Sequence, residues 1–257
     1  MRLWGSAAFV VTNLAAGYAL DFIAADDLIW LIVAGVALCL GAAWLLPPLP
    51  RARRIVGKQG IAGGTPLARS LLRDPAFITV AAAASLIQGS HALYYGFTTI
   101  DWQTAGYGGG AIGLLWGLGV LAEIVLFALS ARLPAAFTPT LLILIGGAGA
   151  LVRWSAMALG PPGALLPFLQ CLHALSFGAT HLGTLAFIGR AAPAGLAATA
   201  QGYFAVSGGV AMAAATGLSG LLYGRFGGAA YGAMAVIAAI GLATALVAHR
   251  MQEDRSR

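Results

Sequence analysis

Charged side chains are scarce in this sequence. They make up 9% of its 257 residues, whereas hydrophobic residues make up 60%. A soluble domain carries about 25% charged residues. So few charges cannot cover the surface of a water-soluble globule of this length, and lipid must therefore be the solvent for much of this surface.

Cysteine is equally rare, since the chain has only Cys39 and Cys171, each inside an apolar run. Two such residues make neither a disulfide framework nor a CxxC metal site, and we expect both to be small core residues. The HExxH, Walker A and GxSxG motifs are absent as well. We therefore expect no enzyme, no catalytic residue, no metal and no cofactor.

Acidic residues are outnumbered by basic ones, 8 against 14, which gives a formal net charge of +6. The basic residues lie between apolar runs and are nowhere interleaved with aromatic residues on a polar background. This pattern argues against nucleic-acid binding. The excess of basic residues is better explained by the positive-inside rule, by which Lys and Arg keep loops on the cytoplasmic side.

Long apolar runs dominate the rest of the chain. A helix that spans a bilayer needs about 20 mostly apolar residues. Eight runs qualify, at residues 3–22, 28–46, 76–100, 109–131, 138–158, 163–189, 195–223 and 228–248. The first could be a signal peptide, but it contains Asn13 and Asp21 and a second span follows at once. The sequence thus predicts an all-α membrane protein with about eight transmembrane helices.

One connection is long, at residues 47–75, and it holds six basic residues. It separates residues 1–46, with two spans, from residues 76–249, with six, and residues 250–257 form a tail. If the spans alternate in direction, 12 of the 14 Lys and Arg fall on one side and only Arg225 on the other. This asymmetry predicts that both termini and the linker are cytoplasmic, as in a multi-pass protein of the inner (plasma) membrane.

Several polar side chains lie within the apolar runs, where each has a cost in free energy and marks a candidate site. They are Gln88, His91, Glu123, Arg153, Gln170, His173 and His181, of which Gln170 has no assigned role. At about 1.5 Å rise per residue, Arg153, His91 and His173 lie roughly 4–8 Å outward of their helix midpoints. Glu123 and His181 lie roughly 4–8 Å inward. Two polar layers are therefore expected.

This set of residues suits proton-coupled transport. An arginine in a low-dielectric cavity can hold a substrate carboxylate through two hydrogen bonds. A carboxyl group removed from water exchanges a proton near neutral pH, and histidine titrates in the same range. We expect Arg153, Gln88, His91 and His173 to bind substrate, and Glu123 and His181 to couple protons.

Structural roles are the alternative for the same residues. Glu123 and Arg153 could form an ion pair, although their depths argue against direct contact, and either His173 or His181 could be an ordinary hydrogen-bonded histidine. His173 and His181 are about 12 Å apart along a helix axis, too far to share a metal. Tyr94 is expected in the aromatic belt at the outer interface.

Six segments resemble one family in sequence and in order. They are RLWGSAAFVV at 2–11, QGSHALYYGFTTIDWQTAGY at 88–107, GLLWGLGVLAEIVLFALS at 113–130, VRW at 152–154, and the pairs LH at 172–173 and HL at 181–182. They resemble helices 5 and 7–10 of major facilitator superfamily transporters. The similarity is to the 3-phenylpropionate permease branch, which is related to lactose permease and nucleoside–proton symporters.

The resemblance implies two six-helix bundles around a central cavity with alternating access. The eight spans then correspond to helices 5–12, and the first four helices are missing. Under this resemblance, Glu123, Arg153 and His173 fall on the helices that carry proton-coupling and substrate residues in lactose permease. The expected function is proton-coupled symport of a small aromatic carboxylate such as phenylpropionate.

Several alternatives stay open at the level of the sequence. Met1 could be a misplaced start, or the chain could be a non-transporting remnant or an interaction subunit. A genuine short form could form a homodimer that rebuilds the cavity. An intramembrane enzyme that uses the histidines is the alternative from another class, and it would show bound metal or turnover.

Overall fold

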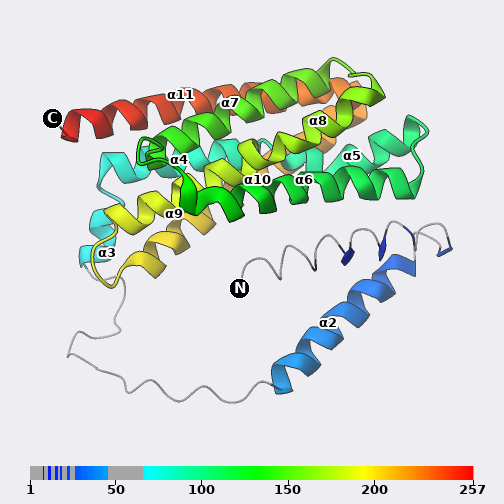
Figure 1. Cartoon of the computed structure of the whole chain (residues 1–257), viewed down its shortest axis with the longest axis horizontal. Helices are drawn as coiled ribbons and strands as arrows, with labels where there is room; N and C mark the ends of the chain where they lie inside the picture. Colours follow the sequence, from blue (N-terminus) through cyan, green and yellow to red (C-terminus); the bar gives the residue numbers. More distant parts are fainter. Residues whose placement is uncertain are drawn as a thin grey trace.

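A computed structural model describes residues 27–45 and 66–256 of the chain, together with isolated residues between 8 and 23. Every regular element in these described ranges is a helix. The long helices of the bundle run side by side along its length (Figure 1). The chain is thus all-α, as its composition predicts.

The helices begin and end as follows. The α-helices are α2 (Leu28–Leu45), α3 (Pro66–Leu71), α4 (Pro75–Gly89), α5 (Ala92–Thr104), α6 (Gly109–Leu129), α7 (Pro139–Ala158), α8 (Leu166–Cys171), α9 (Thr180–Ala191), α10 (Ala197–Phe226) and α11 (Tyr231–Ser256). Short 3₁₀ turns are η2 (Ser130–Arg132), η3 (Gly163–Leu165) and η5 (Gly227–Ala230), and η4 (Ala174–Ala179) is a π-helix.

Five helical stretches of the described chain are long and apolar enough to cross a membrane. They are Pro75–Thr104, Gly109–Arg132, Pro139–Ala158, Gly163–Ala191 and Ala197–Asp254, and the last contains both α10 and α11. These stretches confirm the membrane-protein prediction and coincide with the six spans expected between residues 76 and 248. The expected span at 28–46 is the shorter α2, and the one at 3–22 lies mostly outside the described residues.

Local sequence signals start the bundle's helices. The Asp74 side chain accepts a hydrogen bond from the Ala76 backbone N–H (3.0 Å), and Pro75 is the first residue of α4. Thr138 does the same for α7 by accepting from the Leu141 N–H (3.2 Å). Both arrangements satisfy backbone donors that a helix leaves free at its start, and proline at the first position costs no hydrogen bond.

Two of the spans are interrupted near their middle. The first breaks between α4 and α5, at Ser90 and His91. The second changes from α8 into the π-helix η4, and His173 lies at that change. Such local departures from α-helix are frequent at functional sites. In this bundle they fall where the polar residues meet.

The core of the bundle is built around α4 and α7. α4 packs against α10 and α11, and α7 packs against α9, η4 and α11. Phe77, Ile87, Ile143 and Trp154 are among the fully buried core side chains. Small residues allow the close approach of the helices, since at Gly183 the backbone of α7 leaves no room for a side chain.

Apolar side chains also cover the outside of the bundle, as lipid requires. Leu114 and Leu121 of α6 and Val206 of α10 are exposed. α2 lies apart from the bundle (Figure 1), and its described side chains from Ile29 to Leu45 are all exposed.

Neither cysteine is buried: Cys171 is at the end of α8 in the bundle, and Cys39 is in α2. Cys39 and Cys171 are free and exposed, so their expected place in the core is wrong. Because lipid and protein interior are equally apolar, an apolar run around a cysteine does not distinguish the two environments.

Substitution of Gly183 tests the close packing of α7 and α9. A Cβ atom at 183 would lie 2.5 Å from the Pro139 carbonyl oxygen and 3.1 Å from the Ile143 backbone nitrogen. We expect Gly183→Ala to lower the free energy of unfolding by about 1–3 kcal/mol, measured by denaturant unfolding in detergent micelles. Gly202→Ala is the matched control, because no atom lies within 4 Å of its Cβ position and alanine favours helix. Equal stability of the two variants would contradict the packing described.

Candidate functional site

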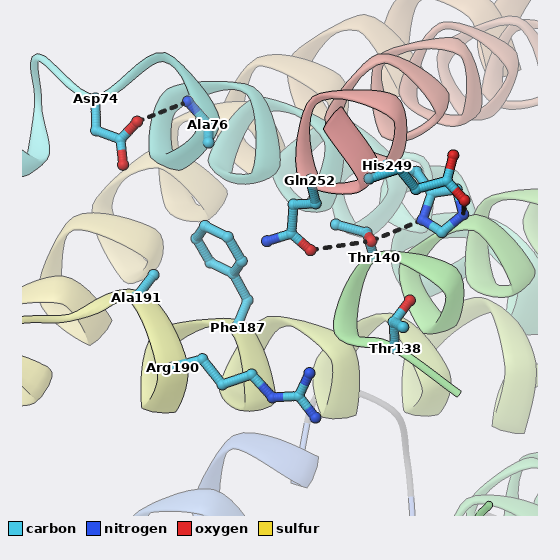
Figure 2. Close-up of a pocket in the computed structure, with 10 residues that line it drawn as sticks. Asp74, Ala76, Thr138, Thr140, Phe187, Arg190, Ala191, His249 and Gln252 are labelled. Carbon is cyan, nitrogen blue, oxygen red and sulfur yellow. Dashed lines mark hydrogen bonds and ion pairs between the residues drawn. The ribbon is translucent and has the colours of Figure 1, made fainter. Parts of the chain in front are cut away.

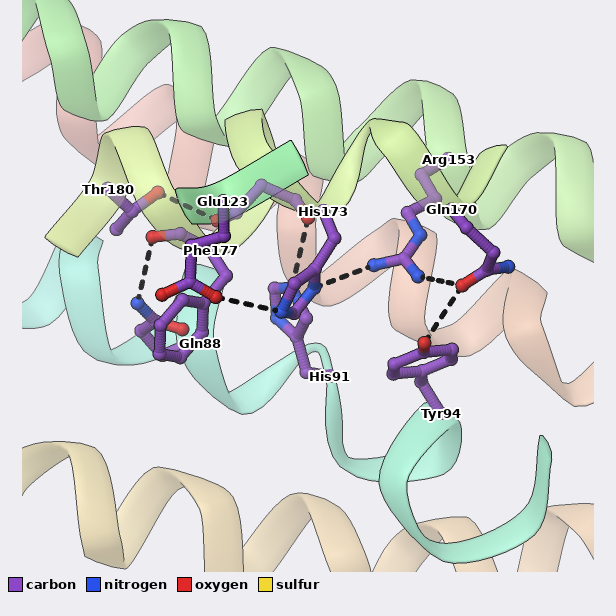
Figure 3. Close-up of polar contacts among 10 residues, drawn as sticks. Gln88, His91, Tyr94, Glu123, Arg153, Gln170, His173, Phe177 and Thr180 are labelled. Atoms are coloured by element: carbon purple, nitrogen blue, oxygen red, sulfur yellow. Dashed lines mark hydrogen bonds and ion pairs between the residues drawn. The ribbon is translucent and has the colours of Figure 1, made fainter. Parts of the chain in front are cut away.

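Four helices and one helix break bring polar side chains together inside the bundle. Arg153 comes from α7, Gln170 from α8, Tyr94 from α5 and Glu123 from α6, and His173 lies between α8 and η4. Figure 3 shows these side chains in one row, from Glu123 through His173 and Arg153 to Gln170 and Tyr94. We refer to these five residues as the arginine cluster.

The guanidinium group of Arg153 is fully buried at the centre of this cluster. Its Nη1 lies 3.1 Å from Nδ1 of His173, and its Nη2 donates to Oε1 of Gln170 over 2.7 Å. Its Cζ lies 4.3 Å from the ring centroid of Tyr94 and 4.6 Å from that of Trp154, which are cation–π distances. Aromatic rings thus replace water around this charge.

No described carboxylate lies within ion-pair distance of the guanidinium group, and its Nε has no described partner. A buried charge without a counter-charge has a desolvation cost of several kcal/mol. An arginine that stays buried under these conditions is equipped to receive an anion from outside the described chain.

The contact with Arg153 determines the protonation of His173. A guanidinium group can only donate hydrogen bonds, so Nδ1 of His173 must accept and must carry no proton. The neutral ring therefore bears its hydrogen on Nε2, which faces Oε2 of Glu123 at 3.6 Å. This distance exceeds a hydrogen bond, and a shift of about half an ångström would close it. His173 thus links the buried cation to the acid.

Gln170 connects Arg153 to Tyr94. Its Oε1 accepts from Arg153 Nη2 and also from the Tyr94 hydroxyl, over 2.8 Å. This fixes the amide so that its nitrogen points away from both, and Nε2 has no described hydrogen-bond partner. Together with the free Nε of Arg153, the cluster has more buried donors than acceptors.

Glu123 is partly buried where α6 meets the π-helix η4. A Cβ atom at Gly178 would lie 3.0 Å from Cδ2 of Leu126 and 3.5 Å from Cγ of Glu123. The glycine therefore lets η4 approach the carboxylate closely. No direct ion pair between Glu123 and Arg153 is found among the described residues, because His173 lies between them.

His91 is fully buried at the break between α4 and α5. Its Nδ1 lies 3.1 Å from the Ile87 carbonyl oxygen, which can only accept, so Nδ1 carries the hydrogen. Nε2 then accepts from the hydroxyl of Ser176, also at 3.1 Å. Because both ring nitrogens form hydrogen bonds, the ring connects α4 to η4. It also packs on Trp154 in a T-shaped arrangement.

Gln88 and His181 lie beside the cluster on the wall of a cavity of about 360 Å³. The Gln88 side-chain nitrogen is 3.4 Å from the Phe177 carbonyl oxygen, a weak hydrogen bond. The rings of His181 and Phe177 stack, with their centroids 6.0 Å apart. Phe177 also stacks on His173 at 5.2 Å, so it separates the two histidines.

A second cavity, of about 400 Å³, lies near the ends of helices α4, α7, α9 and α11 (Figure 2). Within it, the Thr140 hydroxyl donates to Oε1 of Gln252 (3.2 Å) and pairs with Nδ1 of His249 (2.8 Å). The arginine cluster supplies none of its lining residues. Among the residues described, no three His, Cys, Asp or Glu side chains are grouped to hold a metal.

Two members of the cluster differ from what the sequence led us to expect. Tyr94 was expected in an aromatic belt, but its side chain is buried, with the guanidinium group of Arg153 over its ring. Gln170 had no expected role, since it lies in an apolar run and its spacing from Arg153 follows no local pattern. A buried amide in a membrane span is itself the signal that could have identified it.

The arrangement by itself defines a class of protein. Apolar helices that enclose ionisable groups are typical of multi-pass membrane proteins with a substrate or ion path. Comparison with known proteins agrees with this class. The profile of the MFS_1-like family matches residues 1–233. The chain therefore belongs to this family of the major facilitator superfamily, as its sequence resemblance led us to expect.

One curated relative is a protein of Escherichia coli (strain K12) described as a probable 3-phenylpropionic acid transporter. It is 32% identical to this chain over 238 residues. The match covers 93% of this chain, which spans 62% of the length of the relative. No solved structure gives a significant match.

Two substitutions at Gln170 test the energetics of the arginine cluster. Gln170→Leu leaves the donors of Arg153 and Tyr94 without an acceptor, so we expect it to lower the free energy of unfolding by about 1–3 kcal/mol. Gln170→Glu keeps the shape and supplies a carboxylate next to the guanidinium group, so we expect stability at or above that of the unsubstituted chain. Denaturant unfolding in detergent measures both. A less stable Gln170→Glu than Gln170→Leu would show that Arg153 has a counter-charge elsewhere.

Proposed function

We propose that this protein is a proton-coupled symporter for a small aromatic carboxylate and works by alternating access. The observation that carries the proposal is the burial of Arg153 without a described carboxylate partner, next to a neutral histidine that leads to Glu123. One end of the cluster lacks an anion, and the other end holds an acid. A symporter that moves an acid together with a proton needs a site for the anion and a group that carries the proton.

Arg153 is the proposed site of the substrate carboxylate. Its Nε and the Nε2 of Gln170 are buried donors without a described acceptor, and a carboxylate would satisfy them. Since the guanidinium charge is then neutralised, anion binding also removes the desolvation cost of the empty state. His173 and Gln88 complete the proposed binding residues, and His91 contributes by holding η4 against α4.

Glu123 is the proposed proton carrier. When its carboxylate is charged, the hydrogen on Nε2 of His173 points toward it. The carboxylate then polarises the imidazole ring, so that Nδ1 becomes a more negative partner for Arg153. Protonation of Glu123 removes that support and leaves Arg153 in greater need of an anion. Substrate binding and proton binding therefore favour each other, as coupling requires. His181 lies farther along the same span and is the proposed second proton group.

The printed name of the Escherichia coli relative supports an aromatic acid as the substrate. The positions of Lys and Arg support an inner-membrane protein with both termini in the cytoplasm. Under this orientation the second cavity, near the end of α11, opens to the cytoplasm.

Binding without transport is the second candidate function. One observation favours it: the described side chains of α2 are exposed, and most of them are apolar. The arginine cluster would then bind a carboxylate, and contact of α2 with a further apolar surface, for example that of a second copy, would be needed for alternating access. Affinity for the acid therefore has to be measured separately from its transport.

Substitution of Arg153 tests the substrate site. We expect Arg153→Gln to raise the Kd for 3-phenylpropionate about 10- to 100-fold, since hydrogen bonds to charged groups contribute about 1.5–3 kcal/mol. Ligand-induced thermal stabilisation of the purified protein gives the Kd. Arg225→Gln is the control, because it removes the same charge from an exposed position outside the cluster. Equal loss of affinity in both variants, or in neither, would contradict the assignment.

Substitution of Glu123 tests its proposed role as the proton carrier. In proteoliposomes, we expect Glu123→Gln to abolish uphill accumulation of the acid under an imposed proton gradient while exchange of internal for external acid continues. A neutral side chain cannot release a proton, yet it leaves the binding residues in place. Glu253→Gln removes an acid outside the cluster and should accumulate substrate normally. Unimpaired accumulation by Glu123→Gln would remove the proposed role.

A further inference from the structure

The cavity of about 360 Å³ beside Gln88 lies between α4, α9 and α10, and no residue of the arginine cluster lines it. We refer to it as the α4–α9–α10 cavity. Its wall combines apolar side chains with five polar ones, which are Ser85, Gln88, His181, Thr184 and Gln201. Among its described lining residues, none is Asp, Glu, Lys or Arg, and His181 is the one that titrates near neutral pH.

The α4–α9–α10 cavity extends from one end of the bundle toward the middle of the membrane span. At this end α9 stops and α10 starts, joined by residues 192–196. At about 1.5 Å rise per residue, Gln201 lies roughly 6 Å from the start of α10, and His181 lies roughly 15 Å from the end of α9. Gln201 is exposed and His181 is partly exposed. The cavity therefore leads inward from the end of the bundle to His181.

The polar part of the wall suits water. The volume has room for several water molecules, each of which takes about 30 Å³ in the liquid. The Thr184 hydroxyl donates to the Thr180 carbonyl oxygen over 2.8 Å, and the Gln88 amide donates to that of Phe177 over 3.4 Å. The side-chain oxygens of Thr184 and Gln88 have lone pairs that can accept from water. Ionisable residues within a membrane commonly face such water-filled cavities.

His181 contacts the cavity on one side and aromatic rings on the other. Its ring centroid lies 6.1 Å from that of Phe127 and 6.0 Å from that of Phe177. Glu123 belongs to the same surroundings, because a Cβ atom at Gly178 would lie 3.5 Å from Cγ of Glu123 and 3.7 Å from the ring of Phe127. His181 thus lies between the aromatic surroundings of the acid and the cavity.

We propose that the α4–α9–α10 cavity holds water and is the path by which His181 exchanges protons with the solution at this end of the bundle. A proton passes from a ring nitrogen of protonated His181 to a water molecule, which leaves a neutral ring and hydronium, and the reverse step reloads the ring. This inference rests on the proposed function, in which His181 is the second proton group, and adds the path that serves it. The positions of Lys and Arg predict that this end faces the cytoplasm.

Diethylpyrocarbonate tests whether water reaches His181, because it modifies neutral imidazole rings that are accessible to water. The protein is treated in proteoliposomes, and mass spectrometry identifies each modified histidine. We expect His181 to react about ten-fold faster than His91 and His173, which are buried. His249, which is partly exposed and lines the second cavity, is the positive control. If His181 is as protected as His91 and His173, the cavity is dry and the inference is wrong.

Gly208 provides the means to fill the cavity. No atom lies within 4 Å of its Cβ position, so a leucine has room there and occupies part of the cavity. Gly209 has the same open surroundings but does not line the cavity, which makes Gly209→Leu the matched control. We expect Gly208→Leu to slow the modification of His181 about five-fold and to leave that of His249 unchanged. Unchanged modification of His181 would mean that water reaches the ring by another path, which overturns the inference.

Transport by the same variants separates the proton path from the proposed function. We expect Gly208→Leu to slow uphill accumulation of 3-phenylpropionate under a proton gradient about five-fold and to leave exchange unchanged, since exchange needs no net proton movement. Normal accumulation by a Gly208→Leu variant whose His181 is protected would overturn the proton path, although the proposed function stands. If the unsubstituted chain neither accumulates nor exchanges the acid while His181 reacts, both the proposed function and the proton path are wrong.

Discussion

The cost of keeping the charge of Arg153 away from water governs the polar interior of this protein. The guanidinium group is fully buried, and its surroundings compensate for the lost water in two ways. Two acceptors, on His173 and Gln170, take hydrogen bonds from its two terminal nitrogens. The rings of Tyr94 and Trp154 lie at cation–π distance. A counter-charge would be a third compensation, but no described carboxylate is in direct contact with the guanidinium group. This deficit gives the site its proposed affinity for an anion.

The interruptions of two helices make this arrangement possible. In an intact helix, backbone carbonyl groups are used within the helix, whereas at a break they become available to side chains. At the first break the Ile87 carbonyl oxygen receives both the Ser90 hydroxyl and Nδ1 of His91. Next to the second break, the Phe177 carbonyl oxygen receives Gln88. The irregular backbone is therefore buried within protein, where its polar groups find partners away from lipid.

The arginine cluster and the cavity of about 360 Å³ between α4, α9 and α10 differ in chemistry. The cluster offers charge and directed donors, whereas the wall of the cavity combines apolar side chains with uncharged polar ones and His181. Phe177 and Gln88 lie between them.

Membrane class and helix positions were predictable from the sequence, because each span depends on a local property, the mean polarity of about 20 consecutive residues. The candidate residues Glu123, Arg153 and His173 were also predictable, because any ionisable group in an apolar run is conspicuous. Depth along the helices further placed His173 and Arg153 at similar levels, and the structure brings them into contact.

Which polar side chains contact one another, by contrast, was decided by the tertiary structure. The tautomer of His173, the hydrogen bonds of Gln170 and the burial of Tyr94 depend on which helix faces lie opposite one another. A transmembrane helix is apolar on its lipid side and on its packed side, so periodicity does not indicate which face is inside. The same ambiguity explains why the exposure of the cysteines was not predicted. The cavity beside Gln88 was not predictable either, because the packing of α4, α9 and α10 creates it.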